Sequence, residues 1–157
     1  KLLAIVETPK FKDEKSDFIL ALDGIQDPGN MGTILRTADW FGIKEIVCSK
    51  STVDIFNPKV VQSSMGSIFR ISVKYVDLED FLKTSNLPIY GALLEGENIY
   101  QQTLTKRGVL VMGNEGKGIS PEIEAIIGSP INIPRFGTSE SLNVAIATGI
   151  ILSEFSR

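Results

Sequence analysis

Short runs of β-branched and other apolar residues alternate along the chain with longer amphipathic segments. This alternation is typical of βαβ units, in which buried parallel strands are joined by helices that cover the sheet. The apolar runs predict strands at residues 18–22, 45–48, 71–76, 89–94, 109–112 and 131–133. We therefore expect an α/β fold with a mostly parallel sheet and helices on both of its faces.

Residues that favour helix N-termini mark the segments between these strands. They predict helices over 31–41 with Asn30 as the cap, over 57–64 beginning at Asn57 and Pro58, over 77–82 beginning at Asp77, and over 120–128 beginning at Ser120 and Pro121. The chain has 157 residues, which suits one globular domain with a single sizeable core.

A last helix is predicted over residues 139–155, and it is apolar on nearly every face. Such a helix has to be buried on all sides, and a domain of this size seldom encloses its own terminal helix completely. The small residues Ala145, Ala147 and Gly149 would let another backbone approach closely. We therefore expect a homodimer, with an ordinary intramolecular core helix as the alternative.

The composition excludes several kinds of chemistry. The chain has no histidine, which removes an imidazole base, a Ser-His pair and a histidine-bound metal. Its one cysteine, Cys48, lies in the apolar run 46–48 and is expected to be a buried thiol rather than a nucleophile. No metal site is therefore predicted.

The longest apolar runs, such as 144–152, are far shorter than the roughly 20 residues that span a bilayer. No signal-peptide pattern opens the chain, so we expect a cytoplasmic protein with no membrane partner. The sequence begins at Lys1 rather than at a methionine, and further chain is expected ahead of it.

Three segments carry candidate chemistry, and the first is residues 23–38. It combines a strand end, a turn rich in Gly, Pro, Asp and Asn, and the start of a helix. Turns at the carboxyl ends of parallel strands are where α/β folds place ligands. If the guanidinium of Arg36 faces this cleft, it can hold a phosphate with two parallel hydrogen bonds. The alternative is an exposed arginine on an amphipathic helix.

The second segment is residues 109–120, in which a buried strand runs into a loop with three glycines. Glycines at this spacing let backbone groups reach a ligand without obstruction by a Cβ atom. A phosphate-binding P-loop fails on register, because Lys117 precedes Gly118 and Ile119 stands where Ser or Thr is needed.

The third segment is residues 131–145, which joins a last strand to the apolar helix through a loop with Pro and Gly. Ser141 and Asn143 are polar residues at the entrance to a segment that favours burial. Since buried polar groups need partners, these two side chains either cap the helix or face a ligand.

In this order the three segments resemble the motifs of the SpoU/TrmH branch of the SPOUT methyltransferases. The shared patterns are N-x-G-x-x-x-R-T-A, G-N-E-G-x-G and I-P-x-x-G-x-x-E-S-L-N-V-A. The resemblance runs from about Phe18 to the end, and residues 59–70 look like a helix-to-strand passage of the same family. Residues 2–7 look like the segment that joins this domain to an N-terminal RNA-binding domain in many relatives. The resemblance thus divides the chain into a connecting segment, 1–17, and a catalytic domain, 18–157.

The resemblance implies a SPOUT-type fold with a C-terminal trefoil knot, an exception to the rule that chains do not thread their own loops. It also implies that the knotted loops hold S-adenosylmethionine, largely through backbone contacts. Carried over to this sequence, the cofactor-binding residues are Leu93, Leu94, Gly113, Asn114, Gly116, Ile133, Ser141 and Leu142. A mainly apolar lining suits adenine, which is recognised by shape and a few hydrogen bonds.

The activity implied is methylation of a ribose 2′-hydroxyl in RNA, with Arg36, Asn30, Glu115, Ser141 and Asn143 as the catalytic residues. The family assigns proton removal to the arginine, but a guanidinium stays protonated up to a pKa above about 12. We therefore expect Arg36 to bind the adjacent phosphate and to stabilise the developing alkoxide, and a role as literal base stays open. Glu115, expected near Arg36 of the partner subunit, would orient that guanidinium.

Candidate RNA contacts are Arg36, Lys59, Arg70, Lys117 and Arg135. The net charge of −3 argues against a broad basic face, so this domain alone is expected to grip RNA weakly. Ribosomal RNA is the preferred substrate because the opening segment resembles two-domain relatives that act on it, and a tRNA ribose is the alternative. Two further alternatives are a non-catalytic RNA-binding module of the same fold and an unrelated α/β protein that binds ATP through the glycine loop.

Overall fold

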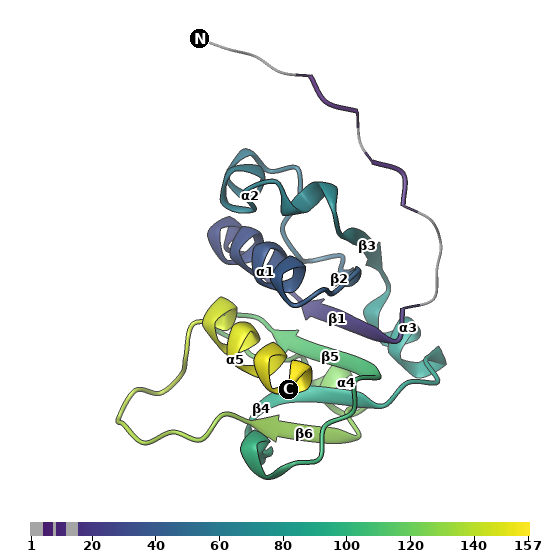
Figure 1. The fold of residues 1–157 in the computed structure, drawn as a ribbon. Helices are drawn as coiled ribbons and strands as arrows, with labels where there is room; N and C mark the ends of the chain where they lie inside the picture. Colours follow the sequence, from purple (N-terminus) through teal and green to yellow (C-terminus); the bar gives the residue numbers. More distant parts are fainter. Residues whose placement is uncertain (1–4, 8, 12–15) are drawn as a thin grey trace.

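The computed structural model describes residues 5–7, 9–11 and 16–157, and residues 1–4, 8 and 12–15 of the expected connecting segment lie outside them. The described residues form a six-stranded sheet in the order β3-β2-β1-β5-β4-β6, and every pair of neighbours is parallel (Figure 1). The strands are β1 (Phe18–Asp23), β2 (Glu45–Ser49), β3 (Ser72–Val76), β4 (Ile89–Asn98), β5 (Gly108–Gly113) and β6 (Ser129–Asn132). The predicted parallel sheet is confirmed.

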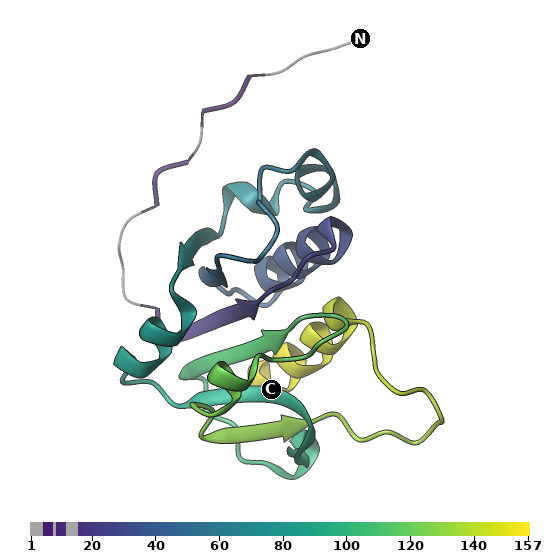
Figure 2. The same ribbon diagram turned by 180° about the vertical axis from the view of Figure 1, so that it is seen from behind.

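Helices cover both faces of this sheet, as the sequence predicted (Figure 2). They are α1 (Pro28–Trp40), α2 (Pro58–Ser63), α3 (Leu78–Thr84), α4 (Pro121–Glu124) and α5 (Val144–Ser156), with single 3₁₀ turns η1 (Ser67–Phe69) and η2 (Ile99–Gln101). Helices α1 and α5 pack on one face, and α3 and α4 pack on the other. None of the helices in the described part of the chain has the length and apolar character needed to cross a membrane.

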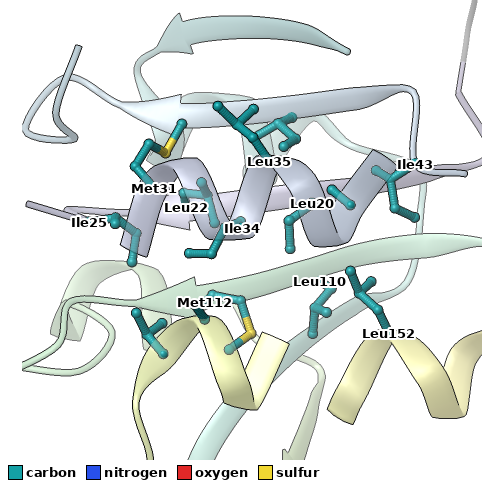
Figure 3. Packing of buried hydrophobic residues seen from close by; sticks show 14 of the residues in the cluster. Leu20, Leu22, Ile25, Met31, Ile34, Leu35, Ile43, Leu110, Met112 and Leu152 are labelled. Atoms are coloured by element: carbon teal, nitrogen blue, oxygen red, sulfur yellow. The ribbon is translucent and has the colours of Figure 1, made fainter. Parts of the chain in front are cut away.

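The alternation of side chains along the central strands divides the core into two layers. Leu20 and Leu22 of β1 point toward α1 and α5, together with Leu110 and Met112 of β5 (Figure 3). The intervening strand residues point to the opposite face, where they meet α3 and α4, and they include Ile19, Ala21, Val109 and Val111. Because both faces are covered, β1 and β5 are apolar throughout rather than alternating, which is typical of a parallel sheet.

The predicted caps of α2 and α3 are confirmed, and that of α1 is wrong. Asp77 Oδ1 accepts from the backbone N–H of Asp80 and so caps α3. Asn57 accepts from the backbone N–H of Lys59, as a cap of α2 should. The cap of α1 is Asp27 rather than Asn30, because Asp27 Oδ1 accepts from the backbone N–H of Asn30 at 2.8 Å and Pro28 begins the helix. The side chain of Asn30 is thereby left to bond elsewhere.

The two C-terminal helices differ from their predicted bounds. α4 ends at Glu124 instead of near Gly128, because the following residues form tight turns and the N–H of Gly128 donates to Ile89 O in the sheet. α5 begins at Val144 instead of at 139, because Asn143 Oδ1 accepts from two backbone N–H groups of its first turn. The serines that precede it lie in an exposed loop.

α5 is also less enclosed than an all-round apolar helix requires. Val144, Ile151 and Leu152 are buried against the core, whereas Ile146 on the outer side is 57% exposed. One face of the helix therefore packs within the domain and the other keeps an uncovered apolar strip.

Candidate functional site

The carboxyl ends of β1 and β5 bring the first two motif segments together. The two strands are paired in register as far as Asp23 and Gly113, so the loop after each strand starts at the same edge of the sheet. Asp23 is almost buried, and its Oδ2 accepts from the backbone N–H of Ser120 at 2.8 Å. This bond fastens the far end of the glycine loop to the end of β1.

Glu115 joins the glycine loop to the turn before α1. Its Oε1 accepts from the Asn30 side-chain amide at 3.1 Å and from the backbone N–H of Asp27 at 3.3 Å. Its Oε2 accepts from the backbone N–H of Gln26 at 3.4 Å. The carboxylate therefore holds three donors of the first segment in place.

Asn143 adds the third segment to the same cluster. Its side-chain N–H donates to Asn30 Oδ1 at 2.9 Å, while its Oδ1 caps α5. Asn30 thus stands between Glu115 and Asn143, and we call these three residues the polar link. Residues from three loops far apart in the sequence meet through it.

The glycine loop is shaped by Asn114. The Asn114 side-chain amide donates to Gly24 O at 2.7 Å, and its Oδ1 accepts from the backbone N–H groups of Gly116 and Lys117, both at 2.9 Å. A Cβ on Gly113 would lie 2.6 Å from Gly118 O, so no other residue fits there. The N–H groups of Gly116 and Lys117 already have partners, which limits the backbone donors that the loop can offer a ligand.

Leu93 and Leu94 lie within β4, at a shift in its register with β6, and Ile133 directly follows β6. The β4–β6 register shifts between Ala92 and Glu97, and the Asn132 side-chain amide donates to the carbonyl oxygens of Leu93 and Leu94. Leu94 is 73% exposed. This corner offers an apolar surface beside the glycine loop, because β4 neighbours β5 in the sheet.

Ser141 and Leu142 lie in the loop between β6 and α5, which extends outward from the body in both views (Figures 1 and 2). The loop is tied internally, since Arg135 Nη1 donates to Ser139 O and the Ser139 hydroxyl donates to Ser141 O. Within the described residues, no hydrogen bond connects Ser141 or Leu142 to the glycine loop. Ser141 and Leu142 are therefore separated from the other expected cofactor residues in this structure.

Arg36 and Arg70, two of the predicted RNA contacts, stand in contrasting surroundings. Arg36 is exposed on α1 and, among the described residues, has no hydrogen bond or ion pair. Arg70 donates from Nε to Asp39 Oδ2 at 2.7 Å, and the hydroxyl of Ser67 donates to the same oxygen at 2.9 Å. The hydrogen bond from Arg70 holds the pKa of Asp39 below its usual value, so the carboxylate stays charged.

The remaining predicted contacts are exposed and weakly tied. Lys59 Nζ lies 3.9 Å from Asp27 Oδ2 beside the turn that precedes α1. Lys117 is exposed in the glycine loop, and Arg135 is exposed in the loop after β6. Lys59 lies in the first turn of α2, and the other two cations lie in different loops.

A depression of 590 Å³, open to solvent, runs between α1 and α5. It is lined by Thr33, Thr37, Phe41, Tyr100, Ala145, Ile146, Gly149, Ile150, Ser153 and Glu154. The sequence predicted that residues of α5 would form a contact surface. It did not identify Thr33, Thr37 and Phe41 of α1, although their spacing of four residues places them on one side of a helix. It also missed Asn132, for which a polar residue at the end of an edge strand was the available signal.

The chain is similar to known RNA-modifying proteins over nearly its full length. The model of the SpoU rRNA Methylase family matches residues 17–153. A 23S rRNA (guanosine(2553)-2′-O)-methyltransferase, RlmP of Bacillus subtilis, is 34% identical over 97% of this chain and 63% of its own length.

Two solved structures share the fold. One is described as a TrmH-family RNA methyltransferase from Porphyromonas gingivalis, with a TM-score of 0.83 and 46% identity over 94% of this chain and 61% of that chain. The other is an AdoMet-bound rRNA methyltransferase from Sinorhizobium meliloti, with a TM-score of 0.84 and 35% identity over 92% of this chain and 57% of that chain. The chain therefore spans less than two thirds of the length of each of these three proteins.

Proposed function

Because the chain belongs to the SpoU rRNA methylase family, we propose that it transfers a methyl group from S-adenosylmethionine to a ribose 2′-hydroxyl of RNA. The observation that carries this proposal is the polar link, in which Glu115, Asn30 and Asn143 join all three motif segments at one edge of the sheet. Ribosomal RNA is the proposed substrate, as for the relative from Bacillus subtilis. A tRNA ribose is the alternative.

Residues of β4, and residues at or just beyond the ends of β5 and β6, fit the cofactor. Leu94 and Leu142 present exposed apolar side chains, and Ile133 is partly buried against the core. Because Gly113 has no Cβ, the glycine loop can fold back so that Gly118 lies directly against it. S-adenosylmethionine supplies, when bound, a methyl group on a positively charged sulfur. We propose that the loop carrying Ser141 and Leu142 folds toward Leu94 when the cofactor binds.

The reaction needs a weakly acidic hydroxyl to be positioned and its developing charge to be stabilised. We propose that the unpaired guanidinium of Arg36 binds the phosphate next to the target ribose and stabilises the alkoxide. Glu115 of one subunit would orient Arg36 of the other, and Asn30, Ser141 and Asn143 support the ribose and the loops. Lys59, Lys117 and Arg135 add phosphate contacts, whereas Arg70 contributes charge through a side chain already held by Asp39.

We further propose that the protein works as a homodimer and that Arg36 of one subunit serves the site of the other. The apolar strip of α5 and the open depression beside α1 support this, because their exposed side chains, such as Ile146, would be covered by a second copy. The residues between 18 and 157 would form the catalytic unit, and residues 1–17 would connect it to further chain. We also propose that such an enzyme acts in the cytoplasm.

A trefoil knot in the C-terminal part is also proposed. In its support, β6 lies at the outer edge of the sheet beyond β4, while α5 returns to pack beside α1 and β5, so the chain crosses back over its own preceding strands. Pulling the protein by both ends tests this. A knotted chain stays shorter than its full contour length, and a chain that extends completely contradicts the knot.

The activity is tested by methyl transfer from labelled S-adenosylmethionine to ribosomal RNA and, in parallel, to tRNA. A 2′-O-methyl group blocks alkaline cleavage at its own nucleotide, so the label should appear in alkali-resistant dinucleotides. Label in single nucleotides would indicate base methylation and would contradict the proposal. RNA binding without transfer would favour the non-catalytic module, and Arg36→Ala serves as the matched inactive variant.

A further inference from the structure

Trp40 is the only tryptophan of the chain, and 84% of it is exposed to solvent. It lies in the last turn of α1, four residues after Arg36. Side chains at this spacing are neighbours on one side of a helix, with Cβ atoms about 6 Å apart. We call the pair the Arg36–Trp40 ridge.

The ridge lies beside the depression between α1 and α5 but does not belong to it. Thr33, Thr37 and Phe41 line the depression, whereas neither Arg36 nor Trp40 does. A second copy seated in the depression would therefore pack against the neighbouring side of α1. The ridge would stay open next to that interface.

The charge around the ridge favours an anionic partner. Asp39, the carboxylate next to Trp40 in sequence, is paired with Arg70 and also accepts from the hydroxyl of Ser67. Lys44 also lies near enough to lower the pKa of Asp39. Arg70 and Lys44 thus both act on this carboxylate, and Arg36 lies three residues before it on α1, although the whole chain carries a net charge of −3.

An exposed aromatic ring among cations is how proteins hold unpaired nucleic acid, because the ring stacks on a base while the cations meet phosphates. We propose that Trp40 stacks on an unpaired RNA base next to the nucleotide whose phosphate Arg36 binds. This rests on the proposed function and specifies its substrate, which must present an unstacked base beside the target ribose. Trp40 is thus a specificity residue, and it takes no part in methyl transfer itself.

The fluorescence of the single tryptophan reports directly on this contact. Short single-stranded RNA of mixed sequence is titrated into the unmodified protein, and a fully paired RNA duplex serves as the control. Stacking predicts saturable quenching by the single strand and much weaker quenching by the duplex. Binding of the same RNAs is measured independently by the anisotropy of an attached dye.

Substitutions separate stacking from simple apolar contact. Trp40→Phe keeps an aromatic face and should change the KM for RNA little, whereas Trp40→Leu should raise it about 5- to 100-fold. The kcat and the affinity for S-adenosylmethionine should stay unchanged in both. Phe56→Leu, at another exposed aromatic residue before α2, is the matched control and should leave the KM as it is.

Four results would overturn the inference. RNA that binds by anisotropy without quenching Trp40, or a Trp40→Leu variant as good as Trp40→Phe, would remove stacking while leaving the proposed function intact. Shielding of Trp40 from acrylamide in the RNA-free dimer would place the partner subunit on the ridge. A chain that binds cofactor but no RNA by anisotropy would contradict the proposed function, and the inference would fall with it.

Discussion

The side-chain amide of Asn143 donates to Asn30 Oδ1 at 2.9 Å, across 113 residues of chain. The other end of the same side chain caps α5, and Asn30 in turn donates to Glu115. One asparagine therefore fixes both the start of the last helix and the position of the first motif. The site and the C-terminal fold are coupled through this residue.

Asn143→Ala should lower the free energy of unfolding by about 1 kcal/mol, because α5 loses its cap. It should also lower methyl transfer, because Asn30 loses a partner. Asn143→Ser is the matched control, since a serine can still cap the helix but is too short to reach Asn30. Chemical denaturation should find the serine variant near wild type, while its activity stays low. Equal activity in the serine variant and the wild type would show that the bond to Asn30 has no functional role.

Gly32→Ala should destabilise the fold by about 1–3 kcal/mol. A Cβ there would lie 2.7 Å from Ser63 Cβ and 2.9 Å from the backbone N of Ser64, so α1 and α2 would have to separate. Gly137→Ala makes the same chemical change in open space and should be tolerated. Thermal unfolding of the two variants compares them, and equal stability would mean that α2 does not pack against α1 as described.

Ile146→Glu should convert the proposed dimer into monomers, because a carboxylate would enter the apolar strip of α5. Methyl transfer should fall with it even though every motif residue is intact, since Arg36 is proposed to act across the interface. Met65→Glu, at a residue 69% exposed elsewhere on the surface, is the control and should stay dimeric. Light scattering gives the molecular mass. A fully active Ile146→Glu monomer would contradict the shared site.

Cys48 should resist thiol reagents in the folded protein and react when the chain unfolds. The thiol is buried, and burial raises its pKa from 9.0 to about 12. The folded state therefore favours the neutral thiol, so this residue's contribution to stability is complete below pH 9 and is lost as the pH rises toward 12. Maleimide labelling with and without urea measures this, and rapid labelling of the native protein would place the thiol at the surface.

Much of the fold could be predicted from local pattern. The apolar runs gave all six strands to within a few residues, and Asn57 was identified as a cap because a proline follows it. The cap of α1 was wrongly assigned because Asp27 and Asn30 are both good caps. Asp27 is the cap because Pro28 fits the first helical position.

The site was harder to derive because it depends on pairs that are distant in sequence. No local sequence pattern shows that the side chain of Asn143 reaches Asn30. Nor does any show that Arg70, a predicted RNA contact, is already bonded to Asp39. The serines at 139 and 141 were expected in the helix, but their own hydrogen bonds compete with it and leave them in the loop.

The most direct test is calorimetric titration of S-adenosylmethionine and S-adenosylhomocysteine into the purified chain, with ATP as the control and Leu142→Arg as the variant that places a cation in the proposed cofactor site. We expect saturable binding of both sulfur compounds, no binding of ATP, and loss of binding in the variant. A folded protein that binds ATP instead, or that binds neither sulfur compound, would contradict the proposed cofactor site and the methyltransferase function with it.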